Sequence, residues 1–527
     1  MLPPESAGEA FLCPLMGIQV TWINNGEVMR MDRSKAQSLL EEVMAIRTQV
    51  KEEGESLFDR WRTASMRPEY EMSARNLAYY MAFRKHDRRT LQHSLIPWGV
   101  SSLGRLEADV MGTLNAVVRT LGFIADRDVG DIDYRTSSSL LERNQALKEN
   151  TAQLFGEVGE RDTRILVTMP SQAGDDYGLV LSLVEAGMDM ARINCAHDEE
   201  DGWLGMIEHI QRAEEETGRQ CRILMDISGP KIRTRHLLTS KRNPKLKEGE
   251  RFLLSVKTAM TLPKGIEIAL NTSVPEVISK IERGQKIKID DGHIEAVATD
   301  ILDDGVICEV ERTVKEGGVK VKTEKGINLP DLDFKLPVLT KKDERDLDFA
   351  AQHADVIAFS FIKDAGDIEM IEEALDSRLE GERRKLPSVA KIETPEGIRN
   401  LPEIIQKAAG ARPFGVMLAR GDLAVEIGYE RLSEVQEELL WICEAAHVPV
   451  IWATQVVESL VKTGIPTRSE MSDVVAGSRA ECIMLNKGDY IVEGVEVVSD
   501  ILEKFEDHHY KKTAMLRSLG IARDAFE

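Results

Sequence analysis

The first part of the chain, residues 1 to about 160, spaces its hydrophobic positions as helices do. One helix face is predicted by apolar residues three and four positions apart: Ala36, Leu39, Leu40, Val43, Ile46 and Val50. A second amphipathic helix is predicted over residues 76–91, and a third by the periodic set Leu106, Val110, Leu114 and Val117. Residues 1–30 show no clear period, which is compatible with disorder.

From residue 161 the pattern changes to short, continuous apolar runs that alternate with helical stretches. Such runs, ended by polar residues, are typical of parallel strands buried on both faces. The predicted strands are 165–169, 190–194 and 223–226, and then 356–359, 388–392, 415–418, 450–453 and 482–485. The two segments that hold them, 161–234 and 327–510, together have roughly 260 residues, and a (β/α)₈ barrel takes about 250.

Residues 235–326 interrupt this rhythm with strand-like runs at 252–256, 266–270, 286–289 and 306–314, separated by Gly, Asp and Pro turns. We therefore expect an α/β protein in which an inserted small β-barrel domain (235–326) acts as a lid on a TIM barrel (161–234 and 327–510). An α-helical N-terminal region (1–160) precedes the barrel, and a C-terminal tail (511–527) follows it.

Charge and composition exclude several classes of protein. The formal net charge of −22 disfavours nucleic-acid binding, because so acidic a chain repels phosphate backbones. No apolar stretch approaches the ~18 residues of a membrane span, and the N-terminus lacks the pattern of a secretory signal. The six cysteines are scattered, which favours a reducing cytoplasm. An anionic substrate would therefore need a locally basic pocket.

Such a pocket is predicted at the carboxyl ends of the barrel strands, where TIM barrels carry their chemistry. Polar residues follow five of the predicted strands: Arg192 and Asn194, Asp226 to Arg233, Lys391 and Glu393, Gly421 and Asp422, and Thr454. Lys391 and Glu393 are two apart on one strand, so their side chains point to the same side. Several cations, two carboxylates and a hydroxyl thus converge.

This set of residues suits phosphoryl transfer. Glu393 and Asp422 are hard oxygen ligands, too few for a calcium cage but suited to Mg²⁺, which keeps waters and binds substrate oxygens. Lys391, Arg192 and Arg233 can neutralise charge on a phosphoryl group in transfer, where catalysis is mostly positioning and electrostatics. The sequence contains no Walker A motif and no kinase-type glycine loop.

At these residues the chain resembles the pyruvate kinase family over about residues 160–505. The resemblance is carried, in order, by the runs 186–194, 226–234, 325–330, 391–397, 419–423, 453–455 and 466–468. It implies a cytoplasmic, homo-oligomeric, glycolytic enzyme that moves the phosphoryl group of phosphoenolpyruvate to ADP, giving pyruvate and ATP.

The resemblance also implies roles for single residues. Lys391 and Arg192 would contact the phosphoryl group, and Glu393 and Asp422 would hold Mg²⁺. The turn at Gly421 and Asp422, with Thr454 as a further catalytic residue, would receive the pyruvate moiety. Asn194, Arg233 and Lys325 would line the nucleotide site, Lys325 being carried in by the lid.

The chain also departs from the family pattern. Potassium-dependent members hold K⁺ with Asn, Ser and Asp side chains; here Asn194 and Asp226 are present, but Ala196 stands where Ser is usual. Lys231 stands where such members carry Glu, and its ammonium could replace K⁺, so we expect K⁺ not to be required. We expect the family's C-terminal allosteric domain to be absent here, and the polar loop that the family carries after the last barrel strand to be shortened to Asn486 and Lys487.

Other interpretations of the same residues stay open. Another barrel enzyme that uses Mg²⁺ and an enolate, such as a lyase or mutase acting on a 2-oxo acid, would share the carboxylates and Lys391. A non-catalytic regulator would be expected to lose them. Taken singly, Lys391 and Glu393 could form a structural ion pair, and Asp422 could cap a helix. The basic residues Arg84, Lys85, Arg88 and Arg89 are expected on an exposed helix face.

Overall fold

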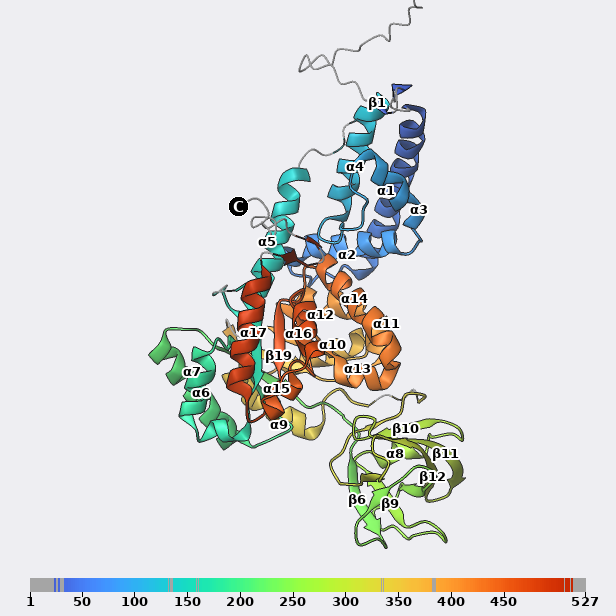
Figure 1. Cartoon of the computed structure of the whole chain (residues 1–527), viewed down its shortest axis with the longest axis vertical. Helices are drawn as coiled ribbons and strands as arrows, with labels where there is room; N and C mark the ends of the chain where they lie inside the picture. The colour runs from blue at the N-terminus through green and yellow to red at the C-terminus, as the bar shows by residue number, and fades with distance from the viewer. Residues whose placement is uncertain are drawn as a thin grey trace, which may run out of the picture.

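The computed structural model describes residues 33–506, with gaps at 131, 133–135, 158, 160, 333, 335 and 382–384 and with side chains omitted at 136–144. It also describes the short pieces 23–24, 27–28, 508–511 and 513–514. Most of the segment 1–30 and of the tail 511–527, for which we made predictions above, lies outside these residues. Helices, barrel and β domain follow one another along the long axis of the molecule (Figure 1).

Eight parallel strands close into a barrel, which confirms the predicted fold class. Their order is β15-β16-β17-β18-β19-β3-β4-β5, with β3 Arg164–Thr168, β4 Met190–Asn194, β5 Arg222–Ile227, β15 Val356–Phe359, β16 Ser388–Ile392, β17 Phe414–Ala419, β18 Val450–Ala453 and β19 Cys482–Leu485. Every residue of β3, β15, β16, β17, β18 and β19 is buried, as continuous apolar runs predict.

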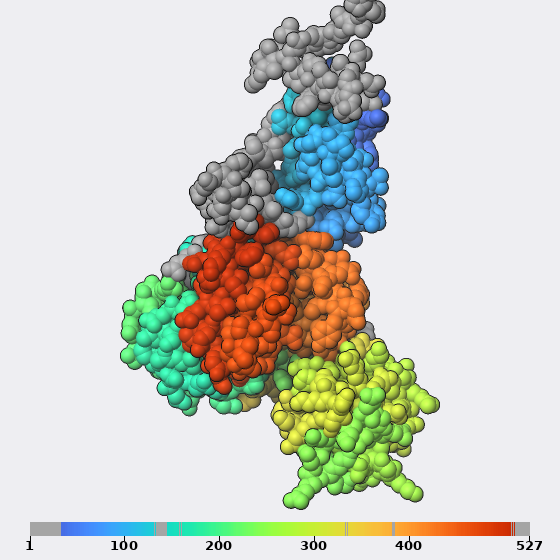
Figure 2. Space-filling view, viewed as in Figure 1, coloured from blue at the N-terminus to red at the C-terminus, as the bar shows by residue number. Residues whose placement is uncertain are grey.

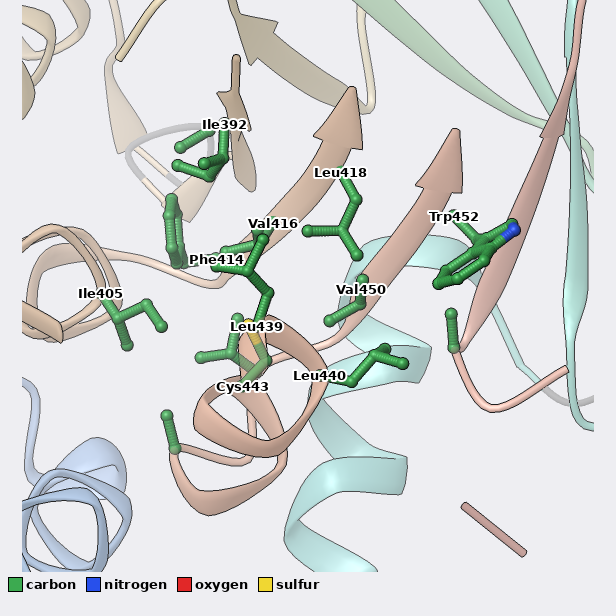
Figure 3. Close-up of a cluster of buried hydrophobic side chains, with 14 of the residues drawn as sticks. Ile392, Ile405, Phe414, Val416, Leu418, Leu439, Leu440, Cys443, Val450 and Trp452 are labelled. Atoms are coloured by element: carbon green, nitrogen blue, oxygen red, sulfur yellow. The ribbon is translucent and has the colours of Figure 1, made fainter. Parts of the chain in front are cut away.

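Helices surround the barrel strands. They are α6 Tyr177–Glu185, α7 Glu200–Thr217, α9 Lys341–His353, α10 Ala365–Asp376, α11 Pro395–Arg399, α12 Leu401–Ala411, α13 Arg420–Ile427, α14 Tyr429–Ala445, α15 Glu458–Thr463, α16 Arg468–Gly477 and α17 Ile491–Glu506. Part of the core between strands and helices is drawn in Figure 3: Leu439 and Cys443 of α14 pack with Val416 and Val450 of the strands. This core holds the strand ends in fixed positions around one mouth.

The inserted segment forms a seven-stranded sheet with its own hydrophobic core. The strand order is β14-β10-β11-β12-β8-β9-β6, with β6 Thr234–Thr239, β8 Arg251–Ser255, β9 Ile268–Thr272, β10 Lys286–Ile289, β11 Ile294–Leu302, β12 Gly305–Thr313 and β14 Ile327–Asn328. A bridge between Arg233 and Gly326 joins the two edges, so the sheet curls toward a barrel. The short pair β7 Lys245–Leu246 and β13 Val319–Lys320 and helix α8 Pro275–Ile278 complete it.

The described part of the N-terminal region contains the helices α1 Arg33–Trp61, α2 Glu71–Arg84, α3 Arg89–Leu95, α4 Val110–Ala125 and α5 Thr136–Phe155. The predicted helix over 76–91 is wrong at both ends: α2 already begins at Glu71 and stops at Arg84, and α3 is a separate helix. The side chain of Asp87 accepts a hydrogen bond from the backbone N–H of Arg89, and such local bonds compete with continuation of a helix. Leu106, predicted in a helix, precedes α4.

The N-terminal helices dock on the end of the barrel opposite the β domain (Figures 1 and 2). His447, before β18, joins them through Ser73 Oγ at 2.9 Å and the Ala108 carbonyl at 3.0 Å. The Asn76 amide donates to the Ala445 carbonyl at 2.9 Å. Within the described residues no helix is long and apolar enough to span a membrane.

Candidate active site

A cavity of about 500 Å³ opens at the carboxyl ends of the barrel strands, next to the inserted domain. Its lining brings together Arg192, Asn194, Arg233, Lys391, Glu393 and Asp422, which the sequence predicted, with Lys231 and His197. Thr454, Gly421, Asp226 and Lys325 are not part of the lining. The described residues contain no group of three or more His, Cys, Asp or Glu side chains arranged to hold a metal ion by themselves.

Asp226 at the end of β5 organises the cations of the cavity floor. Arg192 at the end of β4 donates from Nε to Asp226 Oδ2 at 2.8 Å and from its Nη1 to the Thr168 hydroxyl at 2.9 Å. Burial alone would raise the pKa of Asp226, but Lys391 and Arg192 outweigh it and hold the pKa below its ordinary value. Asp226 is therefore an anion that fixes two cations, and its carboxylate is already fully engaged.

Lys391 lies on β16 with its ammonium at the centre of the floor. Its Nζ donates to the Ser360 hydroxyl at 2.7 Å and lies 3.3 Å from Asp226 and 3.4 Å from Glu393. With only 9% of its surface exposed, the side chain is held in one position. A preorganised, desolvated ammonium of this kind stabilises negative charge far better than one in water.

Glu393 and Asp422 supply the oxygen ligands that a divalent cation needs. Burial raises the pKa of Glu393, and the carboxylate of Asp422 raises it further, against the opposing effect of Lys391 and Lys231. Glu393 also accepts the backbone N–H of Phe361 at 2.7 Å, which fixes its orientation. Two carboxylates that repel each other at one cavity fit a hard cation that takes its other ligands from substrate and water.

Lys231 occupies a position the sequence did not predict. Its Nζ lies 2.7 Å from Asp422 and 3.8 Å from Asp291 of the inserted domain, and it does not contact Asn194 or Asp226. Although burial lowers the pKa of Lys231, Asp422 and Asp291 raise it above the ordinary value. The ammonium is therefore charged, and it neutralises Asp422 from the side of the inserted domain.

Thr454 follows β18 in an unusual backbone conformation. Its φ is 66° and that of Gln455 is 59°, a region that costs energy for residues other than glycine and is enriched at functional sites. The hydroxyl of Thr454 accepts the backbone N–H of Gly421 at 2.7 Å, which joins two of the predicted residues. Arg420 holds this turn by donating to the carbonyls of Ala453 and Thr454, at 3.0 and 2.6 Å.

The guanidinium of Arg420 is in turn paired with the carboxylate of Asp473 on α16, with Nη1 and Oδ1 2.5 Å apart. We therefore expect Asp473→Ala to destabilise the protein by roughly 3 kcal/mol. The loss is large because the Arg420 guanidinium, with 8% of its side chain exposed, would keep its charge without a carboxylate partner. Equilibrium urea unfolding measures it. Asp500→Ala is the control, since the Asp500–Lys504 pair is more than half exposed and such pairs contribute about 0–1 kcal/mol. Equal effects of the two substitutions would contradict this prediction.

The predicted nucleotide residues are only partly brought together. Asn194 and Arg233 line the cavity, whereas Lys325 pairs with Asp290 at 2.8 Å. Arg233 donates to the carbonyl of Glu324 at 3.2 Å, which ties the barrel strand to the inserted domain.

Sequence reasoning missed several residues of the site. Ser360 directly follows β15, so the rule that strand ends carry the chemistry would have found it. Thr168 likewise ends β3. Lys487, near His197, adds a further cation: burial lowers the pKa of His197, and Lys487 lowers it further. Asp473 has no such signal, since it lies within a helix.

Comparison with known proteins points to one family. The family model described as "Pyruvate kinase, barrel domain" matches residues 160–495. Pyruvate kinase of Geobacillus stearothermophilus is 34% identical over 354 residues, which cover 66% of this chain and 57% of that enzyme. Those of Mycobacterium tuberculosis and Clostridium perfringens are 35% and 33% identical, over 66% of this chain and 71% and 72% of theirs.

The fold and the site define a (β/α)₈-barrel protein whose strand ends gather cations around paired carboxylates. The chain belongs to the pyruvate kinase family, whose members generally depend on a metal ion. It spans little more than half of the Geobacillus relative's length.

Proposed function

We propose that the protein is a pyruvate kinase, which transfers the phosphoryl group of phosphoenolpyruvate to ADP. The observation that carries this proposal is the cluster of Arg192 and Lys391 on the buried Asp226, directly beside Glu393. This arrangement presents two fixed positive charges to a phosphoryl group while it leaves the second carboxylate, Asp422, at the cavity. Family membership supports the same conclusion.

In the proposed reaction an oxygen of the ADP β-phosphate attacks phosphorus, and the bond from phosphorus to the enol oxygen breaks. The electron pair stays on that oxygen, giving the enolate of pyruvate, which then takes a proton at its methylene carbon. Lys391 and Arg192 face the charge that develops on the phosphoryl and enolate oxygens. The Gly421–Thr454 contact would position the pyruvate moiety.

Glu393 and Asp422 would hold Mg²⁺, which would supply positive charge to oxygens of the substrate. Lys231 neutralises Asp422, so metal binding requires that this ammonium release the carboxylate. Asn194 and Arg233 would contact the nucleotide. Lys325 would join them only if its pair with Asp290 opens, which we assign to a movement of the inserted domain over the barrel. That the protein is cytoplasmic and forms a homo-oligomer stays a prediction.

The test is a coupled assay for pyruvate with phosphoenolpyruvate, ADP and Mg²⁺, each omitted in turn. Pyruvate and ATP should appear in equal amounts and only when all three are present. Release of pyruvate without ADP would favour a lyase or hydrolase instead, and no turnover in any combination would favour a regulator. Retention of Arg233 at the cavity supports the kinase, because a lyase has no nucleotide to bind.

We further expect the activity to be largely independent of K⁺. The Lys231 ammonium lines the same cavity as Asn194, so its positive charge disfavours a second cation there. Ala196 also removes one oxygen ligand. Initial rates would be measured against KCl, with a bulky non-activating cation that keeps ionic strength constant.

A many-fold rise with K⁺ would contradict this expectation. The matched variant is Lys231→Glu. It should lower activity in the absence of K⁺, because it removes the ammonium that would supply the positive charge of a bound K⁺.

A further inference from the structure

A second cavity, of about 600 Å³, lies between the N-terminal helices and α14 of the barrel. It is lined by the basic run Arg84, Lys85, His86, Arg88 and Arg89 and by Tyr80, Phe83, Glu107 and Trp441. The sequence predicted four of these basic residues on an exposed helix face. Arg84, Lys85 and Arg89 are exposed, as predicted, and Arg88 is partly buried. Together they line a hollow at the junction of α2 and α3, to which Trp441 of α14 also contributes.

Two arginines of this cavity have no carboxylate partner. Arg84 donates to the Tyr80 hydroxyl at 2.6 Å, and its guanidinium lies 4.9 Å from the Trp441 ring and 5.5 Å from the Tyr80 ring. Arg88 donates to the amide oxygen of Gln49 at 3.3 Å and stacks on Phe83. Among the described residues neither forms an ion pair, although the chain carries 90 acidic residues.

The Nε atom of Arg88 also lacks a hydrogen-bond partner. It is buried, which is rare for such an atom because a buried donor without a partner destabilises the fold. Lys85 and Arg89 behave differently, since they pair with Glu53 at 3.1 Å and Asp87 at 2.6 Å. Arg84 and Arg88 are therefore the two arginines of this lining without a carboxylate partner, and both line the same hollow.

The rest of the cavity restricts what an anionic ligand can be. Guanidinium groups match the oxygens of a phosphate with paired hydrogen bonds. The rings of Phe83 and Trp441 lie against these guanidinium groups and help to hold them in place. The volume falls in the usual range for small-molecule sites, about 300–1,000 Å³. Asp87 and Glu107 oppose a ligand with several phosphates.

We propose that this cavity binds a small phosphate monoester, with its phosphate on Arg84 and Arg88 and its organic body in the rest of the cavity, whose volume exceeds that of a phosphate group. The site would connect the N-terminal helices to α14, the helix that follows α13 with Asp422 and precedes β18 with Thr454. It lies at the opposite end of the barrel from the catalytic cavity (Figure 1).

Isothermal titration calorimetry on the full chain tests this, with ribose 5-phosphate, AMP and orthophosphate as probes. We expect at least one ester to bind more tightly than orthophosphate, and the preference between the two esters tells a sugar phosphate from a nucleotide. Arg84→Met and Arg88→Met should each weaken binding at least about tenfold, the effect of losing one charge-assisted contact.

Lys85→Met is the matched control, because it removes a charge of the same run that is already paired, and it should change affinity little. Lys391→Met and Arg233→Met should both leave this binding intact, which separates it from phosphoryl and nucleotide binding at the catalytic cavity. Arg84→Lys and Arg88→Lys, which keep the charge, should also weaken binding, so a folding defect of one methionine variant does not decide the result. Unchanged binding in the arginine variants, or no ester bound at millimolar concentration, would overturn the proposal.

Discussion

Lys391→Met is expected to lower turnover of phosphoenolpyruvate by at least roughly 10²–10³-fold, the contribution of one well-placed electrostatic group. The methionine side chain keeps nearly the same length, but the positive charge between Asp226, Glu393 and Ser360 is lost. Because this charge faces the phosphoryl group mainly in the transition state, the loss should fall on kcat more than on KM.

The measurement is steady-state kinetics of Lys391→Met and of a control variant at saturating Mg²⁺ and ADP. Lys407→Met is the control, since Lys407 pairs with Glu369 on the barrel surface and takes no part in the cavity. Far-ultraviolet circular dichroism would establish that both variants are folded. A folded Lys391→Met protein with nearly normal turnover would overturn the role that we assign to this lysine.

Much of the barrel was predictable because its strands are buried on both faces. A continuous apolar run ended by polar residues leaves little freedom in where a strand stops, and five strands begin and end at the predicted residues, Met190–Asn194 and Val356–Phe359 among them. The strand Ile294–Leu302 was missed because it has no continuous apolar run: its first residues alternate between buried and partly exposed, and its last three are exposed.

The predicted convergence of the site followed from one rule, that parallel strand ends meet at one mouth, and the structure brings Arg192, Lys391 and Glu393 together at one cavity. This rule does not predict which partner a long side chain contacts. Lys231 contacts Asp422, which lies 191 positions further along the chain, and Lys325 pairs with Asp290. Those choices depend on how the inserted domain sits over the barrel, which no periodicity encodes.

The N-terminal region was readable as helices, but its relation to the barrel was not. The last residues of α5, Leu154 and Phe155, are fully or almost fully buried and pack with inward-facing barrel residues such as Leu166, Met190 and Leu224. Gly415 of β17 leaves the space for Leu154, since a Cβ there would lie only 2.5 Å from it. The helix thus closes the floor of the barrel.

Phe155→Ala should therefore destabilise the protein by about 3–5 kcal/mol, the range for removing a buried aromatic ring from a core. The ring is 2% exposed, and the barrel strands around it are held by their own hydrogen bonds, so they cannot collapse to fill the space. The end of α5 is also fixed from the barrel: the Arg222 guanidinium donates to the Gln153 carbonyl at 2.9 Å and that of Arg164 to the Gly156 carbonyl at 2.8 Å.

Urea unfolding followed by circular dichroism measures this effect, and Phe123→Ala is the matched control. Phe123 on α4 is 80% exposed, so the same substitution there should change the unfolding free energy by no more than about 0.5 kcal/mol. If α5 were only a linker in front of an independent barrel, the two substitutions would have similar, small effects. A large loss confined to Phe155→Ala would instead establish that the N-terminal region is part of the barrel's core, and that a barrel without it exposes an apolar floor.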